Sequence, residues 1–301
     1  MASKQSESIK TLYTSWINAM VDKPGMELDE IRGLFEHWGD ITAEPEEVDY
    51  LEVEANGVRA MWAIPKDCAQ DRVALCTHGG GYVTGSMYTH RKLFGHIAKK
   101  VGCKSLIIHY RRAPEHTHPA QVNDAVSAYE WLLAEGYKPE HMFTTGDSAG
   151  GALATSVLLG IKNKKLPLPA ASIPLSPWYD PEGTGKSLDI NADKDCIVSK
   201  EVLANMSAMF LGGASSKDPL ANLLQADISG LPPIYIQVGE DEALLDDSLR
   251  FGELAKKGGV DIKVDVFPEM QHVFHFMAGH APEADDAIEK MSDWVRPKIG
   301  L

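Results

Sequence analysis

The chain has 301 residues, of which 44% are hydrophobic, so it can bury most of its apolar surface in one large domain or two small ones. Its formal charge of -14, without any basic run, argues against nucleic acid and anionic membrane surfaces as partners, because both bind basic patches. Four scattered cysteines, the lack of a signal-peptide pattern and the lack of a membrane-length apolar run predict a cytoplasmic protein with free thiols and no stable membrane association.

The first 45 residues predict two short amphipathic helices. Apolar side chains recur at helical spacing between about residues 8 and 38, and Asp22-Lys23-Pro24-Gly25 interrupts them as a turn signal. From Val48 the apolar period changes to two, and Asn56-Gly57 separates two β-rich runs. Asn-Gly in that setting is a strong hairpin signal, so we expect an antiparallel pair to open the sheet.

Strand and helix patterns then alternate to the end of the chain. The predicted strands are Val73–Thr77, Ser105–His109, Met142–Thr145, Ala171–Leu175, Ile234–Val238 and Ile262–Phe267. The predicted helices are His90–Lys100, Pro119–Glu135, Ala149–Lys164, Ala243–Lys257 and Pro282–Arg296. This order predicts an α/β fold with a mainly parallel, twisted sheet of about eight strands and helices on both faces.

One segment, residues 181–213, breaks the alternation. It has a polar lead followed by a helical run, Glu201–Leu211, that is rich in methionine and phenylalanine. A helical insertion here would lie over the carboxyl ends of the strands, where open α/β sheets bind ligands. We therefore expect residues 1–45 and the insertion 181–213 to form a helical cap over a domain of residues 46–180 and 214–301.

Two glycine motifs point to nucleophilic catalysis. In Gly146-Asp147-Ser148-Ala149-Gly150 the serine lies between a predicted strand and a predicted helix, a setting that forces a tight turn and exposes its Oγ. Upstream, His78-Gly79-Gly80-Gly81 follows a strand, so its backbone N–H groups could converge on an oxyanion. The Gly-Lys-Ser/Thr of a Walker-type phosphate loop is absent from this motif.

A serine nucleophile needs a base and an orienting carboxylate, and both occur in loops after later strands. The acidic run Glu240-Asp241-Glu242 follows one strand, and His272 follows the next, with His275 as the rival base. Asp246 and Asp247 begin the following helix, where carboxylates favour the helix dipole. The chain order is therefore serine, acid, histidine.

Taken together, these motifs resemble the α/β-hydrolase fold, and within it the hormone-sensitive-lipase-like esterases, which carry His-Gly-Gly-Gly ahead of Gly-Asp-Ser-Ala-Gly. The stretch 110–116, Tyr-Arg-Arg-Ala-Pro-Glu-His, also resembles a family segment, departing from it at Arg112. The resemblance implies Ser148 as nucleophile, His272 as general base, and Gly79, Gly80 and Ala149 as oxyanion-hole donors. It implies no metal or organic cofactor.

The resemblance leaves two carboxylates as candidates for the acid. Family members commonly have an Asp that is followed two residues later by Leu and lies about thirty residues before the histidine. Asp241 matches by residue type, but Glu242 matches by both Leu244 and its separation of 30 residues from His272. We expect Glu242 to be the acid.

The expected activity is carboxylesterase action on short- to medium-chain esters through an acyl-enzyme. Lactone or amide hydrolysis, and a non-catalytic receptor of the same fold, are the alternatives. A small-molecule ester is the expected partner, together with a possible homodimer formed through the edge strand 262–267. The expected substrate pocket consists of Tyr82, Trp178, Met206, Phe210 and Phe274, with Met20, Leu34 and Phe35 from the N-terminal helices.

Overall fold

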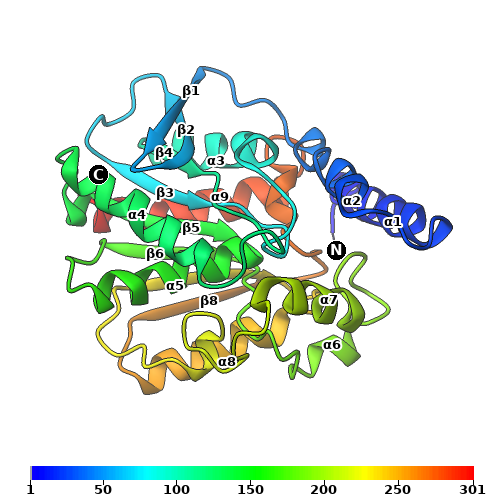
Figure 1. Ribbon diagram of the computed structural model, residues 1–301. Helices are drawn as coiled ribbons and strands as arrows, with labels where there is room; N and C mark the ends of the chain where they lie inside the picture. The colour runs from blue at the N-terminus through cyan, green and yellow to red at the C-terminus, as the bar shows by residue number, and fades with distance from the viewer. Residues whose placement is uncertain (1) are drawn as a thin grey trace.

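A computed structural model describes residues 2–301, so only Met1 of the expected N-terminal segment lies outside the described residues. Its centre is one eight-stranded sheet in the order β1-β2-β4-β3-β5-β6-β7-β8 (Figure 1). The strands are β1 (Val48–Ala55), β2 (Val58–Pro65), β3 (Val73–Thr77), β4 (Lys104–Ile108), β5 (Met142–Asp147), β6 (Ala171–Leu175), β7 (Ile234–Gly239) and β8 (Ile262–Phe267). The predicted fold class is confirmed.

The predicted hairpin opens this sheet. β1 pairs antiparallel with β2 from Val48 opposite Pro65 to Ala55 opposite Val58, with Asn56-Gly57 between the strands. β2 pairs antiparallel with β4, and every later pair is parallel. β8 lies at the edge of the sheet, the position from which we predict homodimerisation.

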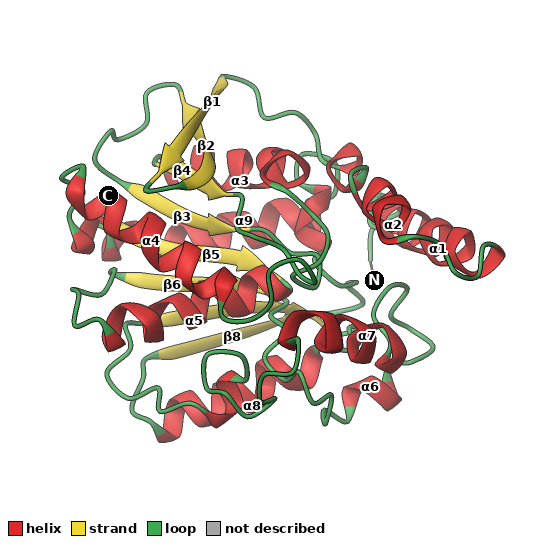
Figure 2. Ribbon diagram, in the orientation of Figure 1, coloured by secondary structure: helices red, strands yellow, loops and turns green. Residues whose placement is uncertain are grey.

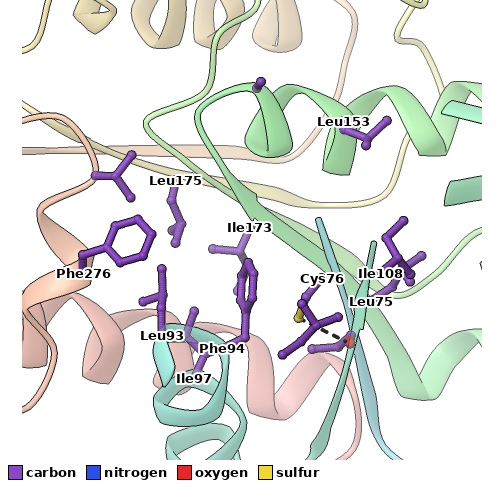
Figure 3. Packing of buried hydrophobic residues seen from close by; sticks show 14 of the residues in the cluster. Leu75, Cys76, Leu93, Phe94, Ile97, Ile108, Leu153, Ile173, Leu175 and Phe276 are labelled. Atoms are coloured by element: carbon purple, nitrogen blue, oxygen red, sulfur yellow. Dashed lines mark hydrogen bonds between the residues drawn. The ribbon is translucent and has the colours of Figure 1, made fainter. Parts of the chain in front are cut away.

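Helices cover both faces of the sheet (Figure 2). On one face α3 (Met87–Val101) packs with α9 (Pro282–Val295); the other face carries α4 (Ala120–Ala134), α5 (Ala149–Asn163) and α8 (Leu245–Lys257). Strands β3, β5, β6 and β7 are buried along their whole length, as expected for parallel strands covered on both sides. Figure 3 shows the core between α3 and the sheet, where Leu93, Phe94 and Ile97 lie near Ile173 and Leu175.

Two helix starts differ from the prediction for local reasons. α3 begins at Met87, three residues before His90, because Ser86 and Thr89 form a capping box at its N-terminus. α8 begins at Leu245, two residues after Ala243, because the chain first makes a tight turn in which the amide of Glu242 bonds to the Gly239 carbonyl.

The remaining helices lie beside the carboxyl ends of the parallel strands, on the right of Figure 1. Near the N-terminus are α1 (Glu7–Asp22), α2 (Leu28–Phe35) and the short 3₁₀ helix η1 (Trp38–Ile41). Residues 181–213 carry α7 (Lys200–Leu211) and also α6 (Ser187–Ile190), a four-residue helix that the sequence did not predict. Within residues 2–301, no helix has the length and apolarity needed to cross a bilayer.

Candidate active site

The loops that follow the parallel strands meet at one edge of the sheet, and four of them contain strained backbone. Non-glycine residues with positive φ occur after β3 (Tyr82, φ 64°), β5 (Ser148, φ 55°), β6 (Ser176, φ 45°) and β8 (Val273, φ 50°). Such conformations cost free energy and persist where the surrounding structure imposes them, often at functional sites. Their common location marks this edge as the candidate active site.

Ser148 occupies the expected turn between β5 and α5. Its φ of 55° and ψ of -122° reverse the chain at the N-terminus of α5, and its amide bonds to the Leu175 carbonyl at 2.9 Å. The flanking Gly150 is needed for close packing, because a Cβ there would collide with the carbonyl oxygens of Thr77 and His78. The side chain of Ser148 is nearly buried at a helix N-terminus, where a developing negative charge is favoured.

In the glycine loop 79–81, one predicted oxyanion donor already has an acceptor within the protein. The amide of Gly79 donates to Asp147 Oδ1 at 3.0 Å, and the ring Nε2 of His90 lies 3.2 Å from Asp147 Oδ2. The N–H of Gly79 is therefore already engaged within the protein. By contrast, no residue in the range 2–301 accepts a hydrogen bond from the amides of Gly80, Gly81 or Ala149.

Glu242 and His272 form a buried pair. His272 Nδ1 lies 2.9 Å from Glu242 Oε2, and both side chains are almost fully buried. Glu242 Oε1 accepts hydrogen bonds from Ser176 Oγ at 2.6 Å and from the Gly239 amide at 2.5 Å. Burial lowers the pKa of His272, but the hydrogen bond and charge of Glu242 outweigh this and hold the pKa above its ordinary value.

The rival residues have other partners. Asp241 faces Lys194 in an ion pair of 3.4 Å, and His275 lies in the core with its Nε2 3.1 Å from Gln237 Oε1. Burial lowers the pKa of His275 to about 3. Asp247 accepts the amides of Tyr179 and Asp180, so it anchors the segment after β6 as well as beginning α8.

The structure brings together four of the eight predicted pocket residues, Tyr82, Trp178, Met206 and Phe210. The rings of Tyr82 and Phe210 stack with centroids 3.9 Å apart, and Trp178 lies 6.1 Å from Tyr82. Met206 also comes from α7, and its Sδ lies 2.8 Å from where a Cβ on Gly81 would be. Phe274 does not join this group: it is fully buried against Phe267 and His275 in the core behind the base.

Ser176 is a site residue that the sequence analysis missed. Its hydroxyl donates to Glu242 and accepts the amide of Val273 at 3.2 Å, so it joins the loop of the acid to the loop of the base. The signal available in the sequence was its position, directly after a buried strand and before Pro177-Trp178.

Comparison with known proteins shows the family of the chain. A family model described as alpha/beta hydrolase fold matches residues 74–276. An acetyl-hydrolase of Streptomyces hygroscopicus is 38% identical over 242 residues, which are 80% of each chain, and an esterase of Acinetobacter venetianus is 33% identical over 219 residues, 72% of each. The crystal structure of an esterase from the bacterial hormone-sensitive lipase family superposes with a TM-score of 0.95, at 39% identity and over 100% of both chains. The chain belongs to the α/β-hydrolase family, in its hormone-sensitive-lipase-like esterase branch.

Proposed function

We propose that this carboxylic ester hydrolase cleaves short- to medium-chain esters through an acyl-enzyme formed on Ser148. The observation that carries the proposal is the buried pair of His272 and Glu242, joined at 2.9 Å, at the same sheet edge as the strained turn of Ser148. Glu242 bonded to Nδ1 leaves Nε2 of the neutral imidazole able to accept a proton from the serine hydroxyl.

The reaction proceeds in two halves. Ser148 Oγ attacks the ester carbonyl while His272 takes its proton, and the tetrahedral intermediate collapses when His272 protonates the leaving alcohol. Water then attacks the acyl-enzyme, giving its proton to His272, and the acid leaves as Ser148 recovers its proton. Glu242 orients the imidazole and stabilises the imidazolium in both halves.

In each half of the reaction, we assign stabilisation of the oxyanion to the backbone amides of Gly80, Gly81 and Ala149. All three are free of protein acceptors in residues 2–301, and Ala149 directly follows the nucleophile at the start of α5. Losing one good donor of this kind costs about 3 kcal/mol of transition-state stabilisation. Gly79, whose amide is held by Asp147, serves instead to fix the loop.

The proposed preference for small acyl groups rests on the insertion. Residues 2–45 and 181–213 form a cap, and its helix α7 brings Met206 against Gly81 and stacks Phe210 on Tyr82. These contacts leave little room beside the oxyanion loop for a long chain.

The test is hydrolysis of p-nitrophenyl esters from acetate to palmitate, run beside Ser148→Ala. We expect the highest turnover with short chains, and its loss in the variant with the circular dichroism spectrum and melting temperature unchanged. Turnover that survives in Ser148→Ala would overturn the mechanism. Serine-dependent turnover of lactones or amides, but not of esters, would redirect the substrate assignment.

A further inference from the structure

The two cap segments reach the backbone of the proposed acid and base. From α1, Tyr13 Oη donates to the carbonyl oxygen of His272 at 2.9 Å. From the insertion, Asn191 Nδ2 donates to the carbonyl oxygen of Glu242 at 2.8 Å and to that of Glu240 at 2.9 Å. Each half of the buried pair is thus held from behind by a different part of the cap.

We propose that Tyr13 and Asn191 are positioning residues, which align the His272–Glu242 pair only while both cap segments are docked. The proposal rests on the triad proposed above and adds a role for the cap beyond enclosing substrate. Neither side chain is assigned any contact with the ester.

The environment of Tyr13 suits a fixed donor. Its side chain is fully buried, and its oxygen also accepts a hydrogen bond from Trp38 Nε1 at 3.2 Å, which fixes the direction of the hydroxyl proton. Within residues 2–301, no second donor reaches the His272 carbonyl. The next residue, Val273, is β-branched with a φ of 50°, a strained conformation that needs external support.

The aromatic cluster anchors this donor to the body of the enzyme. It consists of Tyr13, Trp16, Phe35, Trp38 and Phe276. Its last member belongs to the 3₁₀ helix η4 (Phe274–Met277), which starts two residues after His272. Docking of α1 therefore packs the aromatic cluster against the segment that follows His272.

The insertion surrounds Glu242 in a similar way. Beside Asn191, the carboxylate of Asp195 accepts the amide of Ala243 at 2.8 Å, so the insertion bonds to the backbone on both sides of the Glu242 side chain. The amide of Cys196 donates to Gln271 Oε1 at 2.9 Å, next to His272. Asn191 itself is buried, and both of its hydrogen bonds go to backbone carbonyls of the loop that carries Glu242.

Loss of either donor has a defined chemical consequence. A displaced carbonyl moves the attached side chain, and the bond between Glu242 and His272 loosens. Small displacements of aligned groups reduce the rate of the chemical step far more than they reduce substrate binding. A looser carboxylate also supports the imidazolium less, which lowers the pKa of His272.

The test uses Tyr13→Phe and Asn191→Ala in the full chain, with Tyr129→Phe and Asn222→Ala as matched controls. Tyr129 is a buried tyrosine of α4 whose hydroxyl donates to the Pro167 carbonyl at 2.8 Å, and Asn222 is a buried asparagine that caps a short helix after the insertion. We expect kcat to fall by about 10-fold or more in the two test variants, with KM nearly unchanged. The acid limb of their kcat/KM profile should move to lower pH. The control variants should have the kcat of wild type and an acid limb at the same pH as wild type.

A fall in melting temperature without change in kcat or in the acid limb would show that these side chains are only structural and would overturn the proposal. If Tyr13→Phe does not fold, Asn191→Ala and Trp38→Phe decide the question by the same two readouts, the latter with a smaller effect. The low-field NMR signal of the imidazole proton facing Glu242 should broaden or shift in active variants. Because Ser148→Ala tests the mechanism separately, failure of the positioning role is distinguishable from failure of the proposed function.

Discussion

At the scale of single residues, two adjacent carboxylates compete for the role of the acid that orients the imidazole. Glu242 contacts the imidazole of His272, whereas Asp241 faces Lys194. We predict that Glu242→Ala lowers kcat by about 10³- to 10⁴-fold, because the imidazole loses the group that holds its tautomer and stabilises its charge. Asp241→Ala should stay within about twofold of wild type. Steady-state kinetics with p-nitrophenyl butyrate compares them, and the reverse order would move the acid to Asp241.

The same pair predicts the pH dependence of the enzyme. In the proposed mechanism His272 acts as a base only when neutral, so kcat/KM should fall as the pH drops through its pKa. Because Glu242 holds that pKa above the ordinary value of about 6.5, the acid limb should lie above pH 6.5. In Glu242→Ala, burial lowers the pKa of His272 and no carboxylate at position 242 raises it. The acid limb of the remaining activity should therefore lie at lower pH than in wild type. A pH profile of both proteins checks the sign, and an unchanged limb would contradict it.

The sequence indicates which side chains can come together where loop position decides the outcome. Ser148, Glu242 and His272 follow parallel strands, and the carboxyl ends of parallel strands meet at one edge. The sequence does not reveal hydrogen bonds between a side chain and a distant backbone group. A glycine run does not reveal that Asp147 takes the first amide, and nothing local to Tyr13 reveals that its hydroxyl meets a carbonyl 259 residues away.

At the scale of elements, the packing of α5 against β3 depends on one glycine. A Cβ at Gly150 would meet the backbone carbonyls of Thr77 and His78, which cannot move without breaking the sheet. We predict that Gly150→Ala lowers the free energy of unfolding by about 3 kcal/mol or more. Gly33→Ala is the control, because a Cβ in that helical position meets no atom within 4 Å and should stabilise α2 by about 0.5–1 kcal/mol. Urea unfolding of both variants measures the opposite signs, and equal stabilities would refute the steric account.

Elements with strong periodicity were predicted closely, and those defined by side-chain caps were not. The hairpin, the buried strands and the long helices follow apolar patterns that survive in the fold because each buries its apolar face. The start of α3 depends on a reciprocal hydrogen bond between Ser86 and Thr89, and α6 is a single turn whose neighbour Lys186 donates its amide to Asp246, 60 residues away. Contacts of this kind carry no periodic signal.

At the scale of the whole molecule, attachment of the N-terminal segment couples stability to the site. Besides the aromatic cluster, Arg32 of α2 forms a bidentate ion pair with Glu115, at 2.6 and 2.7 Å, in the loop after β4. The same guanidinium donates to the carbonyls of Val83 and Ala113, so it ties the segment to the chain just after the glycine loop 79–81. The Arg32 cation thus joins two parts of the fold.

This ion pair predicts how stability changes in acid. The Arg32 guanidinium lowers the pKa of Glu115 from 4.5 to about 2, so the pair contributes fully above pH 4.5 and is lost as the pH falls toward 2. Because the Glu115 side chain is 52% exposed, solvent screening limits the contribution to about 1 kcal/mol at most. Glu115→Gln lacks the pair at every pH. Its melting temperature should therefore lie below that of wild type at pH 7, and the gap should close as the pH approaches 2.

Asp29→Asn is the control. It alters a 94% exposed carboxylate 3.6 Å from the same guanidinium, and it should show almost no gap in melting temperature at pH 7. Calorimetry across this range measures both variants, and a Glu115→Gln gap that persists at low pH would show that the side chain stabilises the fold by packing and not by its charge.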